Sequence, residues 1–114
     1  MSDCLFCRII SGEIPADKVY EDAQVVAFRD VNPQAPVHIL VIPRRHLSSL
    51  NAAEEADGEL LANLLLRAAE IARTEGLAAT GYRLVANVGA DAGESVPHLH
   101  FHILGGRPLA WPPG

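Results

Sequence analysis

The chain has 114 residues, which is enough for one domain with a core of its own and too few for a second. Apolar residues make up 49% and charged residues 20%, so the composition is that of a folded globular protein rather than a disordered one. The net charge of −5 argues against a general nucleic-acid or anionic-membrane surface, and no apolar run reaches the roughly 20 residues that cross a bilayer.

The first part of the chain predicts short elements separated by turns. A helical turn ends before Gly12 and Pro15, and two short β-like runs flank three turn residues, as in a hairpin. Two prolines within five residues then predict a loop, and a run that is apolar at almost every position predicts a strand covered on both faces. In chain order, the helical turn covers residues 4–11 and the two β-like runs cover Lys18–Glu21 and Val25–Arg29. The loop covers residues 32–36, and the strand covered on both faces is residues 37–42.

The one long helical pattern runs over residues 54–75. Asn51 and Glu54 resemble a capping box, and Gly76 is well placed to end the helix in a left-handed turn. Apolar residues recur at helical spacing and predict the face that packs on the core. These are Leu61, Leu64, Leu65, Ala68, Ile71 and Ala72.

Two further strands are predicted over residues 82–88 and 98–104, joined by a long loop of Gly and small polar residues at 89–97. Such a loop over a rigid sheet is a good position for a binding site. The proline-rich tail at 105–114 is predicted to be irregular, and its apolar Trp111 is expected to dock on another surface. Short connections between the strands predict an α+β fold with an antiparallel sheet.

Three histidines alternate with apolar residues near the C-terminus. His98, His100 and His102 share one face of the predicted strand at intervals of roughly 6.6 Å, while Leu99, Phe101 and Ile103 face the core. Imidazole titrates near neutrality, and it can attack phosphorus, transfer protons or bind a metal. His100, in the middle, is the best placed to attack if a backbone carbonyl holds the proton of its far nitrogen.

The segment from His98 to Leu104 resembles the histidine-triad pattern, in which three histidines alternate with apolar residues and two apolar residues follow. Several other segments resemble the Hint branch of that superfamily, the purine nucleoside phosphoramidases. They include residues 30–36, His38, residues 41–46, residues 93–96 and the Trp-Pro-Pro-Gly ending at 111–114. The resemblance extends over nearly the whole chain and implies one domain over residues 1–114.

The resemblance implies a hydrolase that cleaves purine nucleoside 5′-phosphoramidates and releases AMP or GMP. His100 would be the nucleophile, with His102, His38 and Ser95 beside it. Asp30 would hold the ribose hydroxyls, and Asn87 would contact the phosphate or the leaving group. The remaining nucleotide-binding residues would be Phe6, Ile9, Phe28, Val31, Leu40, Gly93 and Val96. Without the resemblance, Asp30 and Asn87 would be interpreted as turn residues, and Phe6, Ile9 and Phe28 as core.

Cys4 and Cys7 form a C-x-x-C pair, for which three interpretations compete. A redox pair lacks the preceding strand that a thioredoxin-like motif needs. A disulfide is disfavoured in the cytoplasm, the compartment that two cysteines and the absence of a visible secretory signal predict. A zinc site needs two more ligands, for which His46 and His98 are the candidates, and zinc-bearing members of the superfamily use this combination. The resemblance therefore implies a structural Zn²⁺ site.

Two other functions remain open: a dinucleoside polyphosphate hydrolase, and a zinc-stapled nucleotide-binding adaptor with little turnover. The short chain and the Trp-Pro-Pro-Gly ending argue against the first. Glu94 stands where similar chains usually carry Gln, which predicts a preference for cationic leaving groups. The resemblance also implies a homodimer, with the Trp111 tail near the partner's site, and an exposed edge strand fits that expectation.

Overall fold

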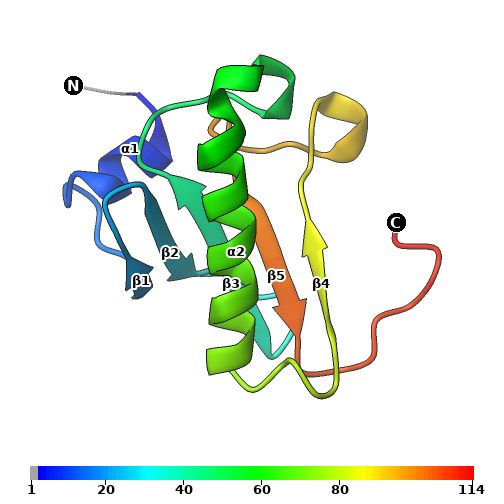
Figure 1. Cartoon of the computed structure of the whole chain (residues 1–114). Coiled ribbons are helices and arrows are strands. Elements are labelled where there is room, and N and C mark those ends of the chain that lie inside the picture. The colour runs from blue at the N-terminus through cyan, green and yellow to red at the C-terminus, as the bar shows by residue number, and fades with distance from the viewer. Residues whose placement is uncertain (1–2) are drawn as a thin grey trace.

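A five-stranded antiparallel sheet with one long helix against it forms the body of the molecule (Figure 1). The computed structural model describes residues 3–114. The strands are ordered β1-β2-β3-β5-β4 across the sheet, so β3 and β5 lie in its centre. In chain order the elements are α1 (Leu5–Ile10), β1 (Lys18–Glu21), β2 (Val25–Arg29), β3 (Val37–Pro43), α2 (Gly58–Thr74), β4 (Tyr82–Val85) and β5 (Phe101–Gly105). Short 3₁₀ turns lie at Leu50–Ala52, Glu55–Asp57 and Ala90–Ala92. The predicted α+β class, hairpin and antiparallel sheet are confirmed.

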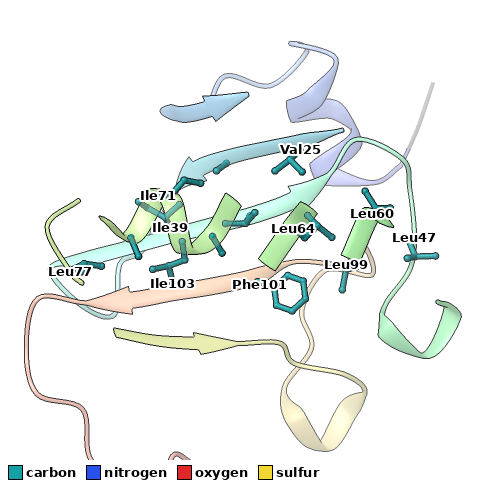
Figure 2. Packing of buried hydrophobic residues seen from close by; sticks show 14 residues of the cluster. Val25, Ile39, Leu47, Leu60, Leu64, Ile71, Leu77, Leu99, Phe101 and Ile103 are labelled. Atoms are coloured by element: carbon teal, nitrogen blue, oxygen red, sulfur yellow. The ribbon is translucent and has the colours of Figure 1, made fainter. Parts of the chain in front are cut away.

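The main core lies between α2 and one face of the sheet (Figure 2). Ile39 and Val41 of β3, with Phe101 and Ile103 of β5, point toward the helix because alternate residues of a strand share a face. Leu64 of α2 packs against them and is fully buried. The predicted packing of Leu99, Phe101 and Ile103 in the core is therefore confirmed.

A second, smaller apolar cluster lies on the opposite face of the sheet. Val26 and Phe28 of β2 and Leu40 and Ile42 of β3 alternate with the residues that face α2. Phe6 and Ile9 of α1 pack against them, because a six-residue helix can bury only one side. The central strands are thus covered on both faces, as predicted for residues 37–42.

The long helix differs from the prediction at its beginning and in its buried face. It begins at Gly58, because Glu54 and Asp57 form a capping box around the 3₁₀ turn that precedes it, so the predicted box of Asn51 and Glu54 is wrong. Leu60 is buried, whereas Leu65 is 47% exposed on the outer side. The predicted end is confirmed: Gly76 adopts φ of +79°, and Leu77 donates its N–H to the carbonyl of Ala72.

The last two strands are shorter than predicted. β4 ends at Val85, and β5 begins at Phe101 rather than His98. Pro97 lacks an N–H, and the N–H of Leu99 donates to the carbonyl of Leu47, 2.6 Å away, instead of joining the sheet. His98, Leu99 and His100 therefore lie outside the ladder.

The C-terminal tail is irregular, as predicted, and runs outward from β5 (Figure 1). Trp111 is 82% exposed, so the expectation that it docks is not met within this chain. Among residues 3–114, no helix is both long enough and apolar enough to span a bilayer.

Candidate functional site

A pocket of about 350 Å³ opens on the face of the sheet that α2 leaves free. This volume lies in the range of small-molecule sites. Its wall is the open side of the smaller apolar cluster, so the same aromatic and aliphatic side chains serve as core and as pocket lining. The predicted residues that line it are Phe6, Ile9, Phe28, Asp30, Val31, Leu40, Ser95, Val96, His100 and His102.

Three predicted residues do not line this pocket. His38 lies behind His102 and is buried, while Asn87 and Gly93 lie on the segment between β4 and β5. Lining residues that the sequence analysis did not single out come chiefly from Ile14, Pro15 and Ala16, which follow α1. Their only sequence signal is an apolar and proline-containing turn, which does not distinguish a pocket wall from any other loop.

His100 is held with one ring nitrogen toward its own backbone. Its Nδ1–H donates to the carbonyl oxygen of His98 at 2.7 Å, so Nε2 carries the free lone pair. The edge of Phe6 packs against the ring, with centroids 5.1 Å apart and planes at 87°. The carbonyl orientation expected of a nucleophile from the sequence is therefore present, and the ring borders the pocket.

His38 and His102 form a hydrogen-bonded pair whose tautomers can be assigned. The backbone N–H of Gln34 donates to Nδ1 of His38 at 3.0 Å, so the proton of His38 is on Nε2. This proton is donated to Nδ1 of His102 at 2.9 Å. His102 therefore carries its own proton on Nε2, and the ring that bears it lines the pocket.

Burial keeps both rings of this pair neutral near pH 7. Desolvation, with smaller contributions from His100 and His38 and against the opposing effect of Asp30, lowers the pKa of His102 to about 4. Desolvation also lowers the pKa of His38, against the opposing effect of Asp30, whose carboxylate lies 3.5 Å from its Nε2. The pair thus offers an N–H donor to the pocket rather than a positive charge.

Asp30, His38 and His102 also place three possible metal-binding atoms close together. The assigned hydrogen bonds disfavour a cation there. The Nε2 atom of His38 carries a proton, and moving it to Nδ1 would set two donors against each other at Gln34. One oxygen of Asp30 already accepts the N–H of Asn32 at 2.8 Å. Asp30 is therefore both the turn residue that the sequence suggested and a pocket-lining carboxylate.

A second hollow of about 420 Å³ lies beside Arg44, Arg45 and Asp57. Both of its arginines are already paired, because Arg44 binds Glu21 at 3.1 Å and Arg45 binds Asp57. None of the five histidines and neither cysteine lines it. It therefore offers no nucleophile, and the histidine-lined pocket is the candidate active site.

Cys4, Cys7, His46 and His98 come together at the end of the sheet, although they are far apart in sequence. Nδ1 of His98 lies 3.3 Å from Sγ of Cys4, 3.6 Å from Sγ of Cys7 and 3.1 Å from Nδ1 of His46. A tetrahedral zinc ion with bonds of about 2.0–2.3 Å spaces its ligands by roughly 3.3–3.8 Å. The four atoms are therefore spaced closely enough to bind one metal ion.

The orientation of His98 also fits a metal ligand. Its Nε2–H donates to the carbonyl of Pro43 at 2.8 Å, which leaves the Nδ1 lone pair facing the two sulfurs. The ring is fully buried, and burial lowers its pKa, so the neutral form that binds metals is favoured. Two sulfurs and two imidazoles are the donor set of structural zinc sites.

Comparison with known proteins places this chain among histidine-triad proteins. The model of the family described as "HIT domain" matches residues 11–109. A HIT-like protein from Synechocystis is 55% identical over 112 residues, which are 98% of this chain and 97% of that protein.

Solved structures give the same result. A HIT family hydrolase from Legionella pneumophila superposes with a TM-score of 0.97 at 54% identity, covering 98% of this chain and all of the other. A histidine triad nucleotide-binding protein from Candida albicans gives a TM-score of 0.83 at 31% identity, covering 96% of this chain and 83% of the other.

Proposed function

Because the chain belongs to the HIT domain family, we propose that it is a hydrolase that cleaves the P–N bond of purine nucleoside 5′-phosphoramidates through a nucleotidyl-histidine intermediate. One observation carries the proposal: the His98 carbonyl fixes the proton of His100 on Nδ1, and the ring borders a mainly apolar pocket. A neutral imidazole with a free Nε2 is a nucleophile toward phosphorus. The names of the Legionella and Candida proteins, a hydrolase and a nucleotide-binding protein, support the same class.

In the first step, Nε2 of His100 attacks the α-phosphorus, the new N–P bond forms and the bond to the amine breaks. The departing nitrogen needs a proton, which the hydroxyl of Ser95 on the pocket wall can donate. The Nε2–H of His102 donates to a phosphate oxygen and stabilises the charge that develops there. Water then attacks the phosphorus of the nucleotidyl-histidine, the N–P bond breaks, and the proton lost by the water returns to Ser95, which releases the nucleoside monophosphate and free His100.

The rest of the pocket is suited to a nucleoside. The carboxylate of Asp30 can accept two ribose hydroxyls, which are donors, whereas it would repel a phosphate. Phe6, Ile9, Phe28, Val31, Leu40 and Val96 offer an apolar surface for a purine. Asn87 and Gly93, which do not line the pocket in this structure, are assigned to the phosphate end by resemblance alone.

We further propose that Cys4, Cys7, His46 and His98 hold a structural Zn²⁺. All four positions of a tetrahedral ion would be filled by the chain, so the ion would have no open coordination site for substrate. Its effect would be to join α1, the segment after β3 and the segment before β5. Thiolates remain available as ligands in a reducing compartment, which accords with the cytoplasmic location proposed for this protein.

A homodimer is proposed as the working form. β4 is an edge strand, its Tyr82 is exposed, and the exposed Trp111 follows Ala110, whose carbonyl accepts a hydrogen bond from Arg83 of β4. A second copy would cover them and would bring its tail toward the site. Light scattering after size exclusion distinguishes a monomer from a dimer directly.

The decisive experiment compares the wild type with His100→Ala on adenosine 5′-phosphoramidate, with AMP release and ammonia release measured together. The wild type is expected to turn over and the variant to fall to background. Rapid quench followed by mass spectrometry of the protein should show a nucleotidyl adduct on the wild type alone.

Each alternative gives a different result. Turnover by His100→Ala would eliminate His100 as the nucleophile. Two inactive proteins that still bind AMP would indicate the adaptor. Preferential cleavage of a dinucleoside polyphosphate over the phosphoramidate would favour the second hydrolase class.

A further inference from the structure

The C-terminal tail contacts the loop at residues 32–36, and this loop in turn contacts the His38–His102 pair beside the pocket. Gly106 adopts φ of +92°, and a Cβ built on it would lie 2.8 Å from Cβ of Pro36. The adjacent Arg107 donates its Nη2–H to the carbonyl of Gln34 at 2.9 Å. Two adjacent tail residues therefore contact the loop at residues 32–36. Gly106 does so by a close backbone approach and Arg107 by a hydrogen bond.

Gln34 favours the Nε2–H tautomer of His38 from the Nδ1 side of the ring, while the Asp30 carboxylate lies 3.5 Å from Nε2 on the other side. The N–H of Gln34 donates to Nδ1 of His38, and its carbonyl is held by Arg107. From there the hydrogen bonds continue to His102, whose ring lines the pocket. A continuous series thus joins an exposed arginine of the tail to the N–H that faces the substrate site.

We propose that Arg107 is a positioning residue that keeps His102 in its Nε2–H tautomer by holding Gln34 against His38. The inference rests on the proposed function, because a phosphate oxygen is the acceptor that this N–H would meet. Among residues 3–114, Arg107 is the group that hydrogen-bonds the carbonyl of Gln34, while the Gln34 side chain is held separately by the carbonyl of Asn32 at 3.0 Å.

The physical reason is that a neutral imidazole has two tautomers of similar energy, and its partners decide between them. If the loop turned and the Gln34 N–H left Nδ1, His38 could carry its proton there instead. Nε2 of His38 would then be an acceptor, and His102 would have to donate from Nδ1. The Nε2 of His102 would lose its proton, and a phosphate oxygen would meet a lone pair instead of a donor.

The test compares Arg107→Ala with Arg83→Ala as the matched control. Arg83 is also a tail-binding arginine, since its Nη2–H donates to the carbonyl of Ala110 at 2.8 Å, but it does not touch the loop. Arg107→Ala is expected to lower kcat on the order of tenfold, the scale seen for outer partners that orient a functional histidine, with KM little changed. Arg83→Ala should retain wild-type kcat. Arg107→Lys keeps a positively charged hydrogen-bond donor, so its kcat should lie between those of the wild type and Arg107→Ala.

A readout independent of turnover is the tautomer itself. Long-range ¹H–¹⁵N spectra of the free protein should show His38 and His102 as Nε2–H in the wild type and Arg83→Ala, and as a mixture in Arg107→Ala. Unchanged tautomers in Arg107→Ala would overturn the proposal, whatever the activity. If the wild type does not cleave the phosphoramidate but the tautomers shift as expected, the proposed function fails while the positioning role of Arg107 stands.

Discussion

Nδ1 of His100 lies 2.7 Å from the backbone carbonyl oxygen of His98, and the ring of His98 is itself a member of the Cys–His cluster. One residue therefore orients the proposed nucleophile with its backbone and offers a ligand atom with its side chain. Because His98 and His100 precede the regular part of β5, the sheet ladder does not fix them. Hydrogen bonds from His98 to the Pro43 carbonyl and from Leu99 to the Leu47 carbonyl hold this segment, and the proposed metal ion would hold it further.

His46→Ala tests metal binding by this cluster at an exposed position. An exposed side chain with no special role changes stability by only about 0.5 kcal/mol. A bound zinc ion at a thousand times its Kd stabilises the fold by about 4 kcal/mol, which for a domain of this size is a Tm difference on the order of 15 °C. The variant should therefore melt far below the wild type in zinc, as followed by circular dichroism with metal analysis of the same samples.

Cys4→Ser and chelation provide the controls for that result. Sγ of Cys4 caps α1 by accepting the N–H of Cys7 at 3.4 Å, and a serine retains this capping ability, so its loss of stability reports on the cluster. With chelator present, the wild type and His46→Ala should melt together. Equal melting temperatures in zinc without chelator would mean that the four residues bind no ion.

Protonation of His102 predicts how stability changes with pH. Its pKa is about 4 in the fold and 6.5 in an unfolded chain, so between these values the unfolded state binds more protons. The contribution of this group is therefore complete above pH 6.5 and is lost as the pH falls toward 4. Its full size is on the order of 3 kcal/mol.

His102→Gln should remove this contribution. Denaturant unfolding of both proteins between pH 7.5 and 4.5 is expected to give the variant a shallower decline of the free energy of unfolding. All other titratable residues are the same in both proteins, so the difference between the two curves reports on position 102. Parallel curves would mean that the fold does not lower the pKa of His102, so that burial does not keep this ring neutral below pH 6.5.

The sequence predicted most of the fold because its patterns are local. The alternation from His98 to Ile103 assigns one face to the core and the other to histidines, and the structure keeps this division even where the ladder is absent. The helix face was harder to predict, since Leu61 and Leu65 fit the helical period as well as Leu60 does. Only the crossing of α2 over the sheet decides which of them is buried.

The candidate site was predictable to the extent that its side chains have distinctive chemistry. The chain has two cysteines and five histidines, so elimination and resemblance could assign four of these residues to one metal site. The structure brings these four together: Cys4, Cys7, His46 and His98. The link from Arg107 through Gln34 to His38 was not predictable, because it runs through a backbone N–H and a carbonyl, groups that every residue carries.

Glu94→Gln tests leaving-group selectivity. Glu94 precedes the pocket-lining Ser95, and its N–H is fixed to the carbonyl of Gly89 at 3.2 Å. A carboxylate here should favour phosphoramidates of cationic amines over neutral ones by about fivefold, since a partly exposed charge pair contributes about 1 kcal/mol. The preference, measured as a ratio of kcat/KM values, should disappear in Glu94→Gln.

Asp91→Asn is the matched control for that experiment. It removes the same charge from an exposed position in the same loop, three residues earlier. It should keep the wild-type preference, and its response to salt should match that of the wild type. Loss of the preference in both variants would indicate a general effect of net charge and not a role for position 94.

Replacing glycine by alanine is expected to change stability in opposite directions at the two ends of the long helix. Gly58 begins α2 with helical dihedral angles of −56° and −43°, and a Cβ there meets nothing within 4 Å. Gly58→Ala should therefore stabilise the protein by about 0.5–1 kcal/mol, because it restricts only the unfolded chain. Gly76 ends the helix at φ of +79°, also with open space around its Cβ. Gly76→Ala should cost about 1–2 kcal/mol.

Because neither Cβ would touch a neighbour, the contrast between the two variants measures backbone conformation alone. Urea unfolding of both variants against the wild type gives the two free energies with one m value if the denatured state is unchanged. A loss of stability in Gly58→Ala would mean that residue 58 leaves the helical region in solution and that α2 begins later than Gly58. A neutral Gly76→Ala would mean that the chain leaves the helix by a route without the left-handed turn, and Leu77 would then no longer be held by Ala72.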